Sequence, residues 1–186
     1  WAKGSVSYQI YVDRFWNGDS SNDVETGEYI YIGQLVQGLK NWEKPLEALD
    51  VGDFYGGDLK GVWEKLDYLQ GLGVEVIYFN PIFVSPSNHK YDCQDYEHID
   101  PHYGVIVKDG GRLLDGLKNP DGGETDRREE NKRATRYITR VTDRKNLDAS
   151  DAFFARVVEE VYRRGRRVIL DGVFNHTGDD SRYFNK

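Results

Sequence analysis

The chain has 186 residues, of which 38% are hydrophobic and 13% aromatic, and its formal net charge is −7. This length suits one domain with a sizeable core, and the aromatic content argues against intrinsic disorder. The acidic balance disfavours a nucleic-acid partner, and no apolar run approaches the roughly 20 residues of a membrane span. The single cysteine excludes an internal disulfide framework. The chain shows no signal peptide and has no methionine, so its compartment stays undefined and it is expected to be a piece of a longer protein.

The first half predicts a strand, a long loop, a helix and a second strand. Residues 5–15 are rich in β-branched and aromatic side chains and predict the first strand. Residues 16–57 predict mostly loop, with a short turn near Pro45–Leu49. The continuous apolar run Val74–Phe79 predicts a strand buried on both faces. Asp58 can cap the helix between them, whose inward residues follow three- and four-residue spacing: Leu59, Val62, Trp63, Leu66, Leu69 and Leu72.

The second half predicts one more helix and one more strand. The helix covers about Ala149–Arg164, and a buried strand follows over Arg167–His176, with polar residues at its C-terminal end. The order strand, helix, strand, helix, strand implies a parallel sheet and an α/β fold. Between the halves, residues 105–147 carry 11 Lys/Arg and 8 Asp/Glu. That near-neutral balance predicts a solvated insertion with some local helix, and argues against a basic arm.

An Asn- and Asp-rich loop follows the first predicted strand and is a candidate calcium site. Calcium takes six to eight oxygen ligands from carboxylates, amides and backbone carbonyls. An EF-hand does not fit, because Asn22 replaces the turn glycine and a strand precedes the loop. On these residues alone, a polar turn without metal is the favoured alternative. The candidate ligands are Asn17, Asp19, Asn22 and Asp23, with Gly56 and Asp58 about forty residues later.

Two further clusters lie near the carboxyl ends of predicted parallel strands, where ligands bind in α/β folds. His89, Tyr91 and Asp92 suit a sugar site, because a tyrosine ring can cover an apolar sugar face. The alternative is a polar loop with Tyr91 packed on the rim. Strand alternation predicts that Asp171 and Asn175 share one face. His176 can be a base, a sugar contact or a structural residue.

Together these segments resemble the α-amylase family of glycoside hydrolases over nearly the whole chain except residues 105–147. The resemblance implies that the chain forms about three βα units, the N-terminal portion of a TIM (β/α)₈ barrel. It also implies that residues 1–186 are a partial catalytic domain. The matching motifs are Tyr8–Phe15 for the first barrel strand, Gly56–Gly61 for the start of the first helix, Val74–Pro81 for the second strand, His89–Tyr96 and Ile99–Gly104 for the loop after it, and Asp171–His176 for the pattern D-x-V-x-N-H.

The resemblance also implies roles for individual residues. Tyr91 would stack on the glucose unit at the cleavage point, with His89 as its neighbour in the substrate site. His176 would hydrogen-bond the same sugar, and Asp171 would hold an arginine from further along the chain. The loop spacing looks like the N-terminal calcium site of the cyclodextrin glucanotransferase and neopullulanase branches, which favours Ca²⁺ there, and Asn175 is a calcium ligand in many members.

The implied function is retaining hydrolysis of α-glucosidic bonds in starch-like glucans. The nucleophile and the acid/base of the family lie on later strands, so no catalytic residue is assigned in this chain, and we expect no hydrolysis without the rest of the barrel. Two alternatives stay open. One is an α-glucan transferase of the same family, and the other is a non-catalytic amylase-like binding or partner module.

Overall fold

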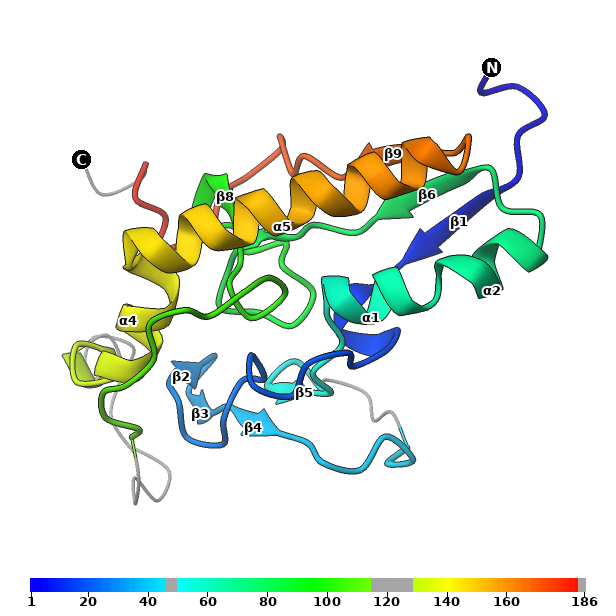
Figure 1. The fold of residues 1–186 in the computed structure, drawn as a ribbon. Helices are drawn as coiled ribbons and strands as arrows, with labels where there is room; N and C mark the ends of the chain where they lie inside the picture. The colour runs from blue at the N-terminus through cyan, green and yellow to red at the C-terminus, as the bar shows by residue number, and fades with distance from the viewer. Residues whose placement is uncertain (46–49, 115–128, 184–186) are drawn as a thin grey trace.

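Three parallel strands form the central sheet of the computed structural model (Figure 1). β1 (Ser7–Ile10) pairs with β6 (Val76–Phe79), and β6 pairs with β9 (Arg167–Leu170). The sheet order β1-β6-β9 therefore follows the chain, and it confirms the predicted parallel α/β arrangement. The structure describes residues 1–45, 50–114 and 129–183, so most of the predicted turn near Pro45–Leu49 and residues 115–128 of the predicted insertion lie outside it.

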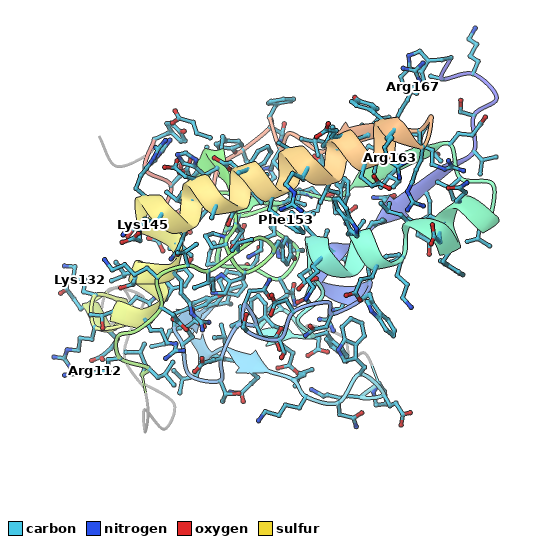
Figure 2. The ribbon with its side chains drawn as sticks, viewed as in Figure 1. Arg112, Lys132, Lys145, Phe153, Arg163 and Arg167 are labelled. Atoms are coloured by element: carbon cyan, nitrogen blue, oxygen red, sulfur yellow. The ribbon has the colours of Figure 1, made fainter. Side chains whose placement is uncertain are left out.

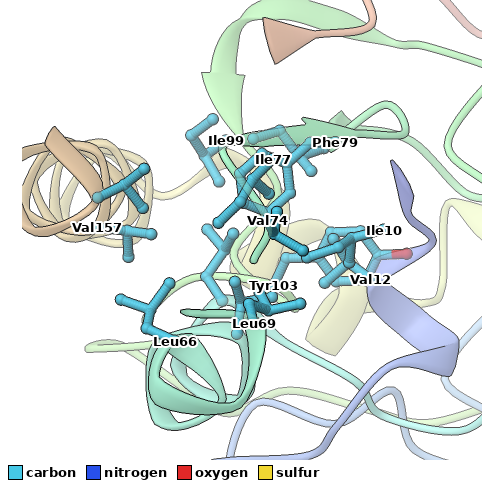
Figure 3. Packing of buried hydrophobic residues seen from close by; sticks show 14 residues of the cluster. Ile10, Val12, Leu66, Leu69, Val74, Ile77, Phe79, Ile99, Tyr103 and Val157 are labelled. Atoms are coloured by element: carbon cyan, nitrogen blue, oxygen red, sulfur yellow. The ribbon is translucent and has the colours of Figure 1, made fainter. Parts of the chain in front are cut away.

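Helices from both crossovers pack against this sheet. α1 (Leu59–Glu64) and α2 (Leu66–Gly71) follow β1, and the long α5 (Arg144–Arg163) precedes β9. Leu66 and Leu69 of α2 meet Ile77 of β6 and Val157 of α5 in one buried cluster (Figure 3). Phe153 of α5 also stacks on Trp63 of α1, with ring centroids 6.3 Å apart (Figure 2). The apolar periodicity therefore identified the faces that form this core.

Several boundaries differ from the prediction. The predicted helix after Asp58 is divided at Lys65, where ψ is 5°, and Leu72 lies beyond α2 and is 51% exposed. The first strand ends at Ile10, and the chain turns into the 3₁₀ helix η1 (Val12–Arg14). α5 begins at Arg144 instead of near Ala149, because the Asp143 side chain caps it by accepting from the Lys145 amide.

β9 was predicted to be buried and to reach His176, and both expectations are wrong. The strand ends at Leu170, which is 38% exposed. Within the described residues β9 pairs only with β6, so it forms an edge of the sheet and its side chains are less covered than those of β6. Val173 then adopts a φ of +48°, which interrupts any continued strand alternation.

The loop predicted over residues 16–57 contains four short strands. β2 (Ile30–Tyr31) and β3 (Gln34–Leu35) form an antiparallel hairpin, while β4 (Gln37–Gly38) pairs in parallel with β5 (Asp53–Phe54). After β6, β7 (Phe83–Val84) and β8 (Asp95–Ile99) form another antiparallel pair. None of the described helices has the length and apolar composition needed to cross a membrane.

The described part of the charged insertion is packed, so the prediction of a merely solvated segment is wrong there. α4 (Thr135–Thr142) contributes Tyr137 and Val141 to a second buried cluster, with Tyr29 and Phe54 of the first loop. The Tyr29 and Tyr137 rings lie 4.0 Å apart. Basic residues of the segment that do remain at the surface, such as Arg112 and Lys132, are visible around α4 in Figure 2.

Arg140 of α4 explains how a charged segment can enter this second core. Its side chain is 1% exposed and donates to Glu28 Oε2 at 2.8 Å, to both Asp109 carboxylate oxygens at 2.9 and 3.0 Å, and to the Asp23 carbonyl at 2.8 Å. Glu28 has no exposure either. The guanidinium therefore compensates a buried carboxylate while its remaining N–H groups are satisfied.

We expect Arg140→Met to lower the free energy of unfolding by about 3–5 kcal/mol, because it removes one of the two cationic partners of buried Glu28 and leaves His102 as the other. Urea denaturation measures the change. Arg133→Met is the matched control, since the Arg133 side chain is 67% exposed and, among the described residues, forms an ion pair only with Glu130. The control should change stability by less than about 0.5 kcal/mol. Equal effects of the two substitutions would contradict the role given to Arg140.

Candidate functional site

Asp58 organises the Asn- and Asp-rich loop. It has no exposure, caps α1, and accepts from the backbone amide of Gly61 at 2.5 Å. It also accepts from the amides of Gly18 and Asp19 at 3.1 and 2.9 Å and from Asn22 Nδ2 at 3.3 Å. Burial nevertheless raises the pKa of Asp58, with these donors opposing the shift. The loop is thus folded around one carboxylate.

Asp23, Asn17 and Gly56 meet on the other side of the same loop. Asn17 Nδ2 donates to Asp23 Oδ1 at 2.8 Å. A Cβ at Gly56, whose φ is +77°, would lie 2.5 Å from that oxygen and 2.7 Å from Asn17 Nδ2. Burial, and to a smaller extent the carboxylates of Asp58, Asp13 and Asp19, raises the pKa of Asp23 to about 7. The structure therefore brings the predicted calcium residues of the loop into one acidic cluster.

Two observations bear on whether a cation fits this cluster. Asn22 Oδ1 is buried and has no hydrogen-bond partner in the structure, so an oxygen ligand is unused. The Asp19 carboxylate, in contrast, accepts from the Ser21 amide and hydroxyl at 3.1 and 2.6 Å. Across the described residues, no group of three or more His, Cys, Asp or Glu side chains has an arrangement that could hold a metal. Any cation here would rely on amide and backbone oxygens as well as carboxylates.

Tyr91 and Asp171 lie together beyond the carboxyl ends of β6 and β9. The Tyr91 hydroxyl donates to Asp171 Oδ2 at 2.9 Å, and the Tyr78 hydroxyl of β6 donates to the same oxygen at 3.2 Å. Burial and the bond to Asp171 raise the pKa of Tyr91 to about 12. The parallel sheet thus joins two predicted residues that are 80 positions apart.

His89 belongs to the same cluster. Its Nδ1 accepts from the Tyr91 amide at 3.1 Å, and its ring centroid lies 5.9 Å from that of Tyr91. Burial lowers the pKa of His89, while nearby Asp92 opposes the shift. Asp92 in turn accepts a short hydrogen bond from the Tyr31 hydroxyl. The loop after β6 is therefore tied to the β2–β3 hairpin at this edge of the sheet.

The predicted sharing of one face by Asp171 and Asn175 is wrong. Asp171 is half-buried against the two tyrosines, whereas Asn175 is exposed, because the chain leaves the strand geometry after Leu170. No contact joins Asn175 to the acidic loop among the described residues. His176 also exposes its side chain, and its carbonyl accepts from the Tyr96 hydroxyl at 2.6 Å.

A chain of buried charges positions the loop that carries His89 and Tyr91. Lys90 Nζ donates to Asp100 Oδ2 at 2.6 Å, and the His102 imidazole bridges Asp100 and Glu28 at 2.8 and 2.9 Å. Arg140 completes the series on Glu28. All five side chains are almost completely buried. The position of Tyr91 thus depends on ion pairs that connect three separate segments.

Sequence reasoning missed several of these partners. The sequence predicts Tyr78 only as part of a buried strand, although a tyrosine hydroxyl within an apolar run needs a hydrogen-bond partner and could have indicated a polar neighbour. Tyr31 was not singled out, and Tyr96 was included only as the end of the His89–Tyr96 motif, without a role of its own. Their contacts to Asp92 and to the carbonyls of Val173 and His176 depend on loop positions that have no sequence periodicity.

Comparison with known proteins agrees with this geometry. The sequence model of the family described as "Alpha amylase, catalytic domain" matches residues 9–121, more than half of the chain. The chain belongs to the alpha-amylase family. This confirms the resemblance drawn from the motifs, including the glycoside hydrolase class and the barrel fold of which the three parallel strands are part.

Individual relatives place the chain in one region of much longer proteins. An amylopullulanase of Thermoanaerobacter thermohydrosulfuricus is 39% identical over 100% of this chain and 10% of its own length. Neopullulanase 2 of Thermoactinomyces vulgaris is 37% identical over 96% of this chain and 21% of its own. The structure of the type III pullulan hydrolase from Thermococcus kodakarensis is 33% identical, with a TM-score of 0.61 over 97% of this chain and 25% of that one. The chain therefore spans about a tenth to a quarter of these relatives.

We expect the stability of the chain to depend on pH through the buried charge series. Burial alone would lower the pKa of His102, but Glu28 and Asp100 outweigh it and raise the pKa. The contribution of His102 is therefore present below about pH 6.5, the pKa of an unfolded histidine, and is lost as the pH rises through the higher folded-state value. Burial alone would raise the pKa of Asp100 and of Glu28. Their cationic neighbours outweigh this effect and lower both pKa values. Their contribution is present above about pH 4 and is lost in acid.

Urea denaturation between pH 5 and pH 9 tests this dependence. The free energy of unfolding of the wild type should fall as the pH rises above about 6.5, and His102→Gln should remove much of that slope. Parallel pH curves for the two proteins would show that His102 is not held protonated by its neighbours.

Proposed function

We propose that the chain forms the N-terminal part of the catalytic barrel of a glycoside hydrolase that cleaves α-glucosidic bonds in starch-like glucans with retention. The observation that carries this proposal is the Tyr91–Asp171 pair at the carboxyl ends of β6 and β9, with its 2.9 Å hydrogen bond. Ligands of barrel enzymes bind at this end of the strands. The relatives named as pullulanases and a pullulan hydrolase support an α-glucan as the substrate class.

Each residue of the cluster has a distinct part in this proposal. The Tyr91 ring offers an apolar face to a sugar, while its hydroxyl stays on Asp171 and fixes the ring. Nearby His89 and the exposed imidazole of His176 supply polar contacts to sugar hydroxyls. Asp171 keeps capacity to accept from an arginine outside this chain. Retaining hydrolysis needs two carboxyl groups about 5–5.5 Å apart, which we place on later barrel strands.

Binding of maltooligosaccharides to the 186-residue chain tests the proposal. Tyr91→Ala should weaken binding about tenfold, because it removes the stacking ring, whereas Tyr91→Phe should retain most of the affinity. Isothermal titration calorimetry measures both. Tyr68→Ala, at a 55% exposed tyrosine of α2 outside the site, is the matched control and should have no effect. Absence of wild-type binding, or release of reducing ends by this chain alone, would contradict the proposal.

We also propose that the acidic loop holds a calcium ion. Asp19, Asp23 and Asp58 form no ion pair with a basic side chain within the described residues, and Asn22 Oδ1 is a buried oxygen without a partner. A cation would supply the missing compensation, with oxygens of Asn17, Asp19, Asn22, Asp23, Gly56 and Asp58 as the donor set. Asn175 is not included, because no contact joins it to the loop. The ion would fix the first loop against the start of α1.

Gly56 and Gly52 provide a matched pair for testing the calcium site. Gly56→Ala should reduce calcium affinity by at least about tenfold, because its Cβ would occupy the space between Asp23 and Asn17, at a φ of +77°. Gly52→Ala should leave the affinity unchanged, since nothing lies within 4 Å of a Cβ there. Calorimetric titration with CaCl₂ measures both, and thermal unfolding with and without calcium gives a second readout. No calcium binding by the wild type would contradict the site.

A further inference from the structure

A cavity of about 490 Å³ lies beside the Tyr91–Asp171 cluster, and the proposed function does not use it. Its wall comes from the β2–β3 hairpin (residues 29–33), from Asp92 and Gln94, from Asn131 and Tyr137 of the charged insertion, and from residues 177–180. Asp92 directly follows Tyr91, and Thr177 directly follows His176. In space, Asp92 Oδ2 also lies 4.0 Å from His89 Nε2, so this wall of the cavity adjoins the site.

The chemistry of this wall suits a carbohydrate. The wall contains aromatic rings as well as carboxylates and amides, and these groups match the apolar faces and hydroxyl edges of a glucose unit. The tyrosines are fixed in place, because the Tyr31 hydroxyl bonds to Asp92 and the Tyr137 hydroxyl donates to Gln94 Oε1 at 2.9 Å. The volume lies within the range of pockets that hold small ligands. The wall is thus ordered before any ligand binds.

The tip of the hairpin breaks a rule of local structure. Ile32 and Gly33 form the two-residue turn with φ values of +44° and +75°. Such turns favour Asn-Gly, and a β-branched residue at positive φ is a genuine outlier. Ile32 is also 64% exposed, so no core packing explains its side chain. An apolar residue in a strained position on the rim of a cavity indicates a contact with a ligand.

The insertion holds this strained hairpin in position. Asn131 accepts from the Ile30 amide at 2.8 Å and donates to the Ile30 carbonyl at 2.9 Å, as a neighbouring strand would. Figure 1 shows the β2–β3 hairpin beside α4, and the close Tyr29 and Tyr137 rings join the same two segments. The charged insertion therefore contributes Asn131 and Tyr137 to the cavity wall and fixes the adjoining hairpin.

We propose that this cavity binds further glucose units of an α-glucan whose reacting unit lies on Tyr91, and that Ile32 makes an apolar contact to them. The inference rests on the proposed function and extends it. The charged insertion and the hairpin thereby set a preference for longer glucan chains. Ile32 is the residue to which we assign this preference, because it lines the cavity and its side chain is 64% exposed.

Ile32→Asn separates this role from a structural one. Asparagine tolerates positive φ, so the variant should be at least as stable as the wild type in thermal unfolding. The wild-type chain should bind maltohexaose more tightly than maltose in calorimetric titration. In Ile32→Asn the ratio of the two affinities should fall by about fivefold, as expected for loss of one apolar contact. Val107→Asn, at a 60% exposed β-branched residue outside the cavity, should leave the ratio unchanged.

The outcomes distinguish the two proposals. An unchanged affinity ratio in Ile32→Asn, or equal wild-type affinity for maltose and maltohexaose, overturns the cavity proposal. The proposed function is still sustained in that case if maltose binding depends on Tyr91. A stability loss in Ile32→Asn that matches its loss of binding shows a structural role for Ile32 and also overturns it. Absence of binding to either sugar overturns both.

Discussion

Glu28 is a carboxylate without solvent exposure, and the arrangement of the loops around the site follows from the need to compensate it. Its two oxygens are bound by His102 and Arg140, which come from the loop after β6 and from α4. Desolvating so many charges costs about as much as their attraction returns, so such a series is weak evidence for high stability. Its effect is geometric. Each charge has a partner only when the first loop, the loop carrying Tyr91 and the insertion occupy these relative positions.

The two buried clusters accordingly have different tasks. The cluster between the sheet and helices α1, α2 and α5 depends on apolar periodicity and places the carboxyl ends of β6 and β9 side by side. The second cluster joins loop residues such as Tyr29 to Tyr137 of α4 and shapes the cavity wall. A rigid sheet that positions variable loops is the usual division in barrel enzymes. In this chain the loops form a second buried hydrophobic cluster, separate from the one that packs on the sheet.

The sequence was sufficient for the parts of the molecule that depend on local pattern. Alternating strands and helices predicted the parallel sheet, and the rule about carboxyl ends predicted that Tyr91 and Asp171 each lie at the ligand-binding end of that sheet. The role of Arg140 could not be predicted, because its partners Glu28 and Asp109 are 112 and 31 residues away and nothing distinguishes it from its charged neighbours. The end of β9 was predicted wrongly because a β-branched residue such as Val173 favours an extended backbone, so the sequence does not indicate its positive φ.

The contrast between Glu28 and Asp58 also separates the two acidic regions of the first loop. Both carboxylates are completely buried, but Glu28 is bound by cations, whereas Asp58 is bound only by N–H donors. N–H dipoles satisfy hydrogen bonds without cancelling net charge, so no ion pair with a basic side chain among the described residues offsets the charges that Asp19, Asp23 and Asp58 carry when ionised. The raised pKa of Asp23 reflects this excess, after the larger effect of burial. A cation therefore has an electrostatic reason to bind beside Asp58 and none to bind beside Glu28, although both regions contain clustered carboxylates.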